Sequence, residues 1–184
     1  MSPAGGRLAG LLLAAGLSAG SVRADSIHLY SYDPADAATR HAAGPLTFTF
    51  RKGLLHNTVL NLRSTEAPAT AVLRPADDRA LGSGGPRGAL DSPAAERGLY
   101  EVEPGQEGAA LISAFCPGAA RAWMAFGPLK LNRGLTVVVV GAPAGGGPAK
   151  LCRTLRFSFH GEWRLPPGRA IDPRDLRYGR YPGG

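Results

Sequence analysis

The sequence predicts an all-β fold: a single-domain β-sandwich of seven to nine short, mostly antiparallel strands, with one minor helix and one disulfide. Three observations lead to this prediction. Short alternating or apolar segments recur along the chain, and glycine- and proline-rich turns separate them. After an expected export signal, 160 residues remain, which is the size of one domain with its own core. Two cysteines stand far apart within that domain.

The first 24 residues have the layout of a secretory signal peptide. Arg7 precedes a ten-residue apolar run from Leu8 to Leu17, and Val22-Arg23-Ala24 provides a small residue before Asp25. The run is shorter than the roughly 20 apolar residues that span a bilayer. We expect cleavage after Ala24, export to the periplasm or out of the cell, and no transmembrane segment in the mature chain. A short membrane anchor or a buried core helix would be the alternatives.

The first half of the mature chain predicts strands at residues 26–32, 46–51, 55–63 and 70–73. The first is rich in β-branched and aromatic residues, and the second and third alternate apolar with polar positions. Asp33 to Gly44 should form a loop with one helical turn. Residues 74–81 predict the minor helix, with Pro75 in its first turn. The glycines of residues 82–88 predict a surface loop, which lacks the lysine and hydroxyl residue of a phosphate-binding loop.

The second half predicts strands at residues 99–102, 109–116, 121–126, 135–141 and 151–163. Residues 109–116 are apolar enough for a helix or a strand, and we favour a strand. Four consecutive valines, Val137 to Val140, suit a strand that is buried on both faces. Arg153 falls on the apolar face of the last strand, so we expect its register to break near Thr154.

The domain is therefore expected to span residues 25–165, followed by a disordered basic tail at 166–184. That tail contains four arginines, four prolines and four glycines, and it has too few apolar groups to offset the entropy of ordering. The net charge is +7 for the whole chain and +5 without the signal. Of the 21 basic residues 18 are arginines, an excess that we attribute mainly to coding bias. Attraction to anionic lipids or acidic partners is the functional alternative.

Cys116 and Cys152 are the only cysteines of the chain. In an oxidising compartment they permit one bridge, closing a loop of about 36 residues that would stabilise the fold by roughly 3–4 kcal/mol. Because Cys116 ends one predicted strand and Cys152 begins another, the bridge would join two strands. Free thiols, a redox pair and metal ligation are the alternatives, but no CxxC motif is present.

The mature chain lacks the common catalytic and metal-binding motifs. Its histidines show no close metal-ligand spacing, and Glu101 and Glu103 could share one strand face as an acid/base pair. Glu162, beside His160 and Trp163, forms the most suggestive polar-aromatic cluster. We nevertheless predict no catalytic residue, no cofactor site and no metal site. The four histidines considered are His28, His41, His56 and His160.

One family shares the order and spacing of several segments. IHLYSYDP, GPLTFTF, GLYEV and LISAFC are followed by a strand pair, a second cysteine and LRFSFHGEWRLPP. This series resembles the lumenal domain of the ER membrane protein complex subunit 10 family, over residues 26–166. The resemblance implies a non-enzymatic β-sandwich with a similarly spaced cysteine pair that docks on membrane-protein partners. The sequence departs from the family in two ways: its composition is typical of a bacterial protein, and it lacks the family's C-terminal membrane-spanning segment, so we expect a bacterial, soluble version.

The expected function is an exported, non-enzymatic binding or accessory domain of the cell envelope, with a protein partner that could be a membrane protein. No nucleic acid is expected as a partner. The alternative is a small secreted hydrolase or a carbohydrate-binding domain, which a convergence of His160, Glu162 and His28 or His56 would favour. The sequence identifies neither the ligand nor the oligomeric state.

Overall fold

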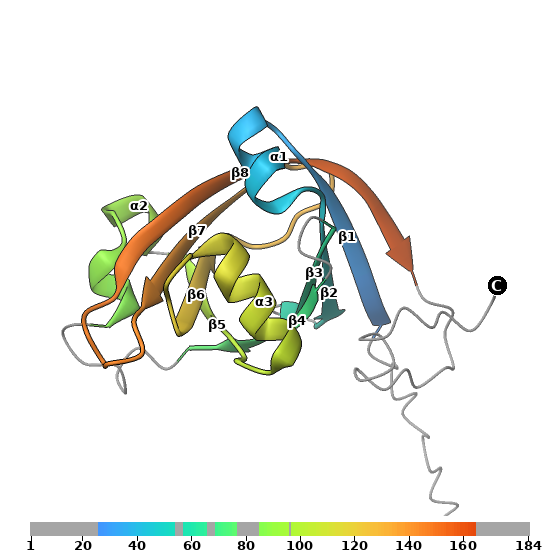
Figure 1. The fold of residues 1–184 in the computed structure, drawn as a ribbon. Helices are drawn as coiled ribbons and strands as arrows, with labels where there is room; N and C mark the ends of the chain where they lie inside the picture. The colour runs from blue at the N-terminus through green and yellow to red at the C-terminus, as the bar shows by residue number, and fades with distance from the viewer. Residues whose placement is uncertain (1–25, 54–56, 66–68, 77–84, 96, 165–184) are drawn as a thin grey trace, which may run out of the picture.

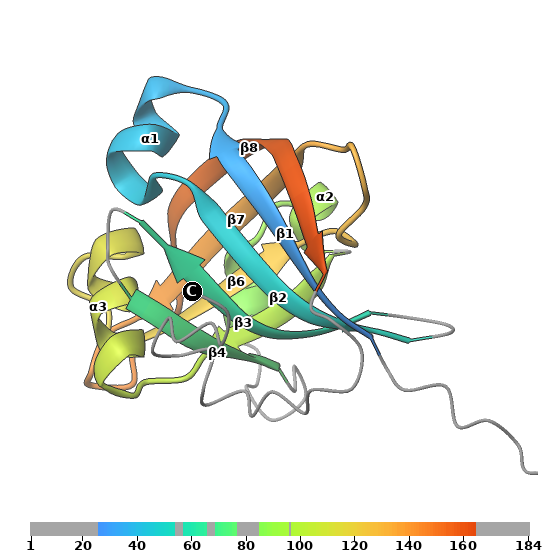
Figure 2. The same cartoon turned by 90° about the vertical axis from the view of Figure 1, so that its right-hand side faces the viewer.

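The fold is a closed, eight-stranded antiparallel barrel in a computed structural model that describes residues 26–53, 57–65, 69–76, 85–95 and 97–164. Each strand pairs with the next in the chain, and β1 pairs with β8 to close the sheet (Figures 1 and 2). The strands are β1 (Ser26–Pro34), β2 (Leu46–Lys52), β3 (Asn57–Ser64), β4 (Ala69–Pro75), β5 (Gly98–Val102), β6 (Arg121–Phe126), β7 (Leu135–Ala142) and β8 (Lys150–Arg164).

The predicted mostly-β fold is confirmed, but the predicted sandwich is wrong. A sandwich needs two sheets facing each other, whereas seven partner positions of β1 on β8, from His28–Arg164 to Pro34–Phe157, join the first strand to the last. Because the sheet closes, each of the eight described strands has a neighbouring strand on both sides. The expected signal at 1–24 and the expected tail at 166–184 lie outside the described residues.

Three short helical segments and one longer helix accompany the barrel. They are α1 (Ala37–Ala43), the 3₁₀ turn η1 (Pro86–Ala89), α2 (Ser92–Ala95) and α3 (Gln106–Phe115). Asp36 caps α1: its carboxylate accepts a hydrogen bond from the backbone N–H of Thr39 at 2.7 Å, which holds the pKa of Asp36 below its usual range. Figure 2 shows α1 and α3 near the same end of the barrel.

Two predictions of local structure are wrong. Residues 109–116 belong mainly to helix α3, because Leu111, Ile112 and Phe115 recur at helical spacing and bury one face in the core. The minor helix expected at 74–81 is not formed at its start, where Arg74 and Pro75 end strand β4. Residues 77–81 of that prediction lie outside the described residues.

Side chains fill the barrel interior. Phe48, Phe50 and Phe126 are completely or almost completely buried there, together with Tyr32. The Phe48 and Phe126 rings lie 5.1 Å apart between centroids, and Tyr32 meets Phe48 edge-on. Burial raises the pKa of the Tyr32 phenol above its ordinary value. The interior is therefore a hydrophobic core.

A second, smaller core covers part of the outer barrel surface. Val137 and Val139 face the barrel interior, whereas Val138 and Val140 join Leu99 and Trp123 in this outer core. All four valines are at most 5% exposed, so the prediction of a strand buried on both faces is confirmed. Within the described ranges, no helix is both long enough and apolar enough to cross a membrane.

The predicted Cys116–Cys152 disulfide is present, with 5.2 Å between the two Cα atoms. Cys116 is the C-cap of α3 and Cys152 lies in β8, so the bridge joins a helix end to a strand rather than two strands. The predicted register break in β8 is also present: Val139 pairs with Arg153 and Val140 with Leu151, which leaves Cys152 as the extra residue, two positions before Thr154.

Candidate functional sites on the barrel

The polar cluster suggested by the sequence is divided between the two faces of the barrel wall. His28 of β1 is buried, and its Nδ1 lies 2.6 Å from Oε1 of Glu162 in β8. The His28 ring stacks on Phe50, a residue of the interior core. The carboxylate of Glu162 thus orients the His28 ring. Both side chains are largely buried beside the aromatic core, with 6% and 14% of their surface exposed. His56, the other histidine considered for this cluster, lies outside the described residues.

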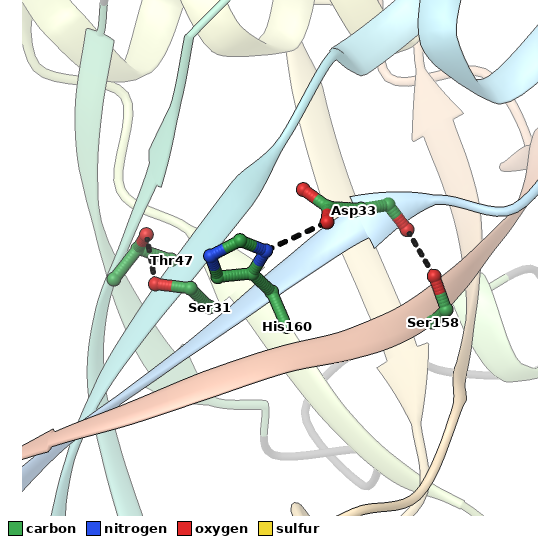
Figure 3. Close-up of polar contacts among 5 residues, drawn as sticks. All are labelled: Ser31, Asp33, Thr47, Ser158 and His160. Atoms are coloured by element: carbon green, nitrogen blue, oxygen red, sulfur yellow. Dashed lines mark hydrogen bonds and ion pairs between the residues drawn. The ribbon is translucent and has the colours of Figure 1, made fainter.

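His160 forms a separate pair on the outer surface. Its Nδ1 lies 2.7 Å from Oδ2 of Asp33, and both side chains are about half exposed. Figure 3 shows the His160 ring between the Asp33 carboxylate and the hydroxyls of Ser31 and Thr47. Those hydroxyl oxygens lie 3.0 Å apart, and the Ser158 hydroxyl donates to the backbone carbonyl of Asp33 at 3.4 Å.

The outer pair and the nearby Ser31 together provide the residue types of a serine-histidine-aspartate triad. A carboxylate bound to Nδ1 orients an imidazole so that Nε2 can act as a base toward a hydroxyl. In the described structure, however, the Ser31 hydroxyl pairs with Thr47 and not with His160. Trp163, the third member of the predicted cluster, is 60% exposed and takes part in neither pair.

The other candidate carboxylates form ordinary surface ion pairs. Arg121 donates to Glu101 through Nε and one terminal nitrogen, at 2.9 and 2.6 Å, while Arg74 donates to Glu103 at 2.8 Å. Each glutamate therefore forms an ion pair with a different arginine, and the two carboxylates are not arranged as an acid/base pair. His41 is exposed on α1. Among the residues that the structure describes, no group of three or more histidine, cysteine or acidic side chains is arranged to hold a metal.

A groove borders the disulfide, and we call it the disulfide groove. It is formed by residues 116–119, 141–143 and 150–153, and its volume is about 360 Å³. Lys150 and Arg153 supply its charged groups. Arg153 is half-buried, and its Nε is a buried donor that has no acceptor in the described structure. A buried guanidinium N–H without an acceptor is costly, so a ligand with an anionic oxygen would be stabilised here.

A second groove lies over the outer face of β6, and we call it the Trp123 groove. Pro86 of η1, Arg121 and Trp123 of β6, and the loop between β7 and β8 line it, and its volume is about 550 Å³. Proline, alanine and glycine make up the rest of its surface. Trp123 is 2% exposed, and its indole Nε1–H lacks an acceptor in the described structure. The guanidinium of Arg121 lies 4.8 Å above the ring.

Sequence reasoning missed this groove. The sequence predicts the strand RAWMAF, but the contact of this strand with the proline- and glycine-rich residues 142–149 and with Pro86 depends on the fold. The alternation of β6 was the available signal, because it places Arg121 and Trp123 on the face opposite Ala122 and Met124.

Comparisons with protein-family models, curated proteins and solved structures found no match to this chain.

Proposed function

We propose that this protein is an exported, non-enzymatic accessory domain of the cell envelope that binds a partner protein through the Trp123 groove. One observation carries the proposal: small apolar residues and Trp123 line the groove, and the buried indole N–H of Trp123 has no acceptor among the described residues. Buried hydrogen-bond donors in folded proteins almost always have acceptors, and a buried donor without one lowers stability by about 1–3 kcal/mol. A bound backbone carbonyl would supply the missing acceptor.

The packing of the barrel supports an outer binding surface. Eight-stranded barrels can hold a small ligand when their interior is open. Here Leu46, Phe48, Phe50 and Leu62 are 0% exposed and occupy the interior. The Trp123 groove, in contrast, is an open concave surface beside the outer core.

Two further observations support the compartment and the kind of partner. A structural disulfide is typical of oxidising compartments such as the periplasm or the extracellular space. The segment order that resembles the ER membrane protein complex subunit 10 family favours docking on membrane-protein partners. Both the export route and the membrane-protein partner are proposals.

Site-specific photo-crosslinking in cells tests the docking surface. We expect a photoreactive residue at Ala144, an exposed position of the groove, to give one dominant protein adduct, because a docked segment would pass within its reach. The same residue at Thr154, exposed on β8 but outside both grooves, should not give that adduct.

The Trp123→Phe variant is the decisive comparison. Phenylalanine keeps an aromatic ring but removes the N–H, so the adduct at Ala144 should weaken while the disulfide and the thermal melting transition are retained. An adduct that forms equally well from Thr154, or that is unchanged in the folded Trp123→Phe variant, would contradict binding in the groove.

The pair of Asp33 and His160 favours a second candidate, a small secreted hydrolase with Ser31 as its nucleophile. We expect a fluorophosphonate probe to leave Ser31 unlabelled, since its hydroxyl pairs with Thr47 rather than with His160. Mass spectrometry of the treated protein measures this. Labelling at Ser31 that is lost in His160→Gln and kept in Ser158→Ala would establish the hydrolase candidate instead.

A further inference from the structure

The Trp123 groove and the disulfide groove adjoin each other. Ala142 and Pro143 line both, and the remaining walls continue from Ala119 in one groove to Ala120 in the other. A chain segment lying in the Trp123 groove would therefore reach the disulfide groove by crossing the base of the β7–β8 loop. The two grooves thus meet at Ala142 and Pro143, and we call them together the track, with an apolar part at Trp123 and a cationic part at the disulfide.

The cationic part has no counter-charge among the described residues. Lys150 and Arg153 form no ion pair in the part of the chain that the structure describes, and neither groove is lined there by an aspartate or a glutamate. Arg121, in the apolar part, is already neutralised by Glu101 at 2.6 Å. The unsatisfied positive charge of the track is therefore concentrated beside the disulfide.

Resting on the proposed function, we infer that the bound partner is an extended polypeptide segment that carries an acidic side chain or a C-terminal carboxylate. One of its backbone carbonyls accepts from the indole N–H of Trp123, and its small or proline residues pack on the apolar walls. Its carboxylate lies beside the disulfide, where Lys150 and the Arg153 guanidinium donate to it. The inferred partner segment is therefore apolar where it lies in the Trp123 groove and anionic where it lies in the disulfide groove.

Peptide binding to the intact, oxidised protein tests this assignment. The probe is a short fluorescent peptide of alternating proline and alanine that ends in two aspartates, and its comparison peptide has asparagines and an amidated C-terminus. Fluorescence anisotropy should show about tenfold tighter binding of the aspartate peptide, the difference expected for one charge-assisted hydrogen bond pair. Rising salt should reduce that preference because one side chain of the pair, Lys150, is exposed.

Charge-matched variants locate the effect. Arg153→Gln and Lys150→Gln should each reduce the preference for the aspartate peptide, whereas Arg156→Gln should not. Arg156 is an exposed arginine of the same strand outside both grooves, so its loss changes the net charge equally. Trp123→Phe should weaken both peptides to a similar degree, because the N–H binds a backbone carbonyl that both peptides contain.

The possible outcomes separate this inference from the proposed function. Equal binding of the two peptides, or an equal effect of Arg156→Gln, would overturn the acidic partner, while the crosslink from Ala144 would still support docking in the groove. Failure of both peptides to bind would overturn the extended-segment chemistry. Loss of the Ala144 crosslink as well would overturn the proposed function itself.

Discussion

Replacing Phe48 by alanine should lower the free energy of unfolding by about 3–5 kcal/mol, as expected for a large side chain removed from a packed core. Phe48 is 0% exposed in the centre of β2, and its ring contacts those of Phe126 and Tyr32 across the barrel interior. Alanine would leave a cavity that these rigid aromatic neighbours cannot close. Urea denaturation of the oxidised protein measures the loss.

Leu131→Ala is the matched control for the Phe48 variant. Leu131 is a large apolar residue that is 50% exposed, so its truncation should change the free energy of unfolding by less than about 0.5 kcal/mol. If Phe48→Ala were as mild as Leu131→Ala, the barrel interior would not be a packed core. An interior ligand site would then have to be considered instead of the outer grooves.

Alternation, β-branched and aromatic content and apolar runs between turns predicted most of the strands. For β6 the predicted and observed limits are both Arg121–Phe126, and for β7 they differ by one residue. Alternation states that one face of a strand is buried, but it does not state which strand lies beside it. The difference between sandwich and barrel depends on the pairing of β1 with β8, which are separated by more than 100 residues. No residue pattern within β1 or within β8 indicates that these two strands pair.

The error at α3 has a different origin. An apolar run of eight residues has no periodicity that separates a buried strand from a buried helix, and its length is at the upper limit of the strand range. The preceding residues decide the outcome: Gly105 is the N-cap, and Gln106, Glu107 and Gly108 extend the helix to ten residues. Tertiary burial of Leu111, Ile112 and Phe115 against the barrel then fixes the helical face.

A single bulge explains why the predicted polar cluster divides. His160 and Glu162 are two residues apart, so a regular strand would place both side chains on one face. Ser31 pairs with Gly161 and Tyr32 with Phe159, which leaves His160 as the extra residue. Glu162 therefore reaches the buried His28, while His160 meets Asp33 on the outer surface. Bulges depend on the partner strand, so the sequence of β8 alone could not place these groups.

Replacing Gly141 by alanine should cost about 3 kcal/mol or more of unfolding free energy, comparable to the loss of the disulfide itself. A Cβ at this position would overlap the Cys116 sulfur, and it would lie only 2.7 Å from the Ala119 Cβ and 3.1 Å from the Cys152 sulfur. The strand and the bridge cannot both keep their positions. Free-thiol titration, together with urea denaturation, measures whether the bridge still forms and how much stability is lost.

Two comparisons separate the clash from a general effect of alanine. Gly145→Ala, in the β7–β8 loop, meets no atom within 4 Å and should leave stability nearly unchanged. In the Cys116→Ala/Cys152→Ala background, the further cost of Gly141→Ala should shrink, because both sulfurs are absent and Ala119 alone opposes the new methyl group. If Gly141→Ala lowered the free energy of unfolding equally with and without the cysteines, glycine would be required at this position by the strand rather than by the disulfide. A coupled cost would mean that strand β7, helix α3 and the wall of the disulfide groove depend on one another through this glycine.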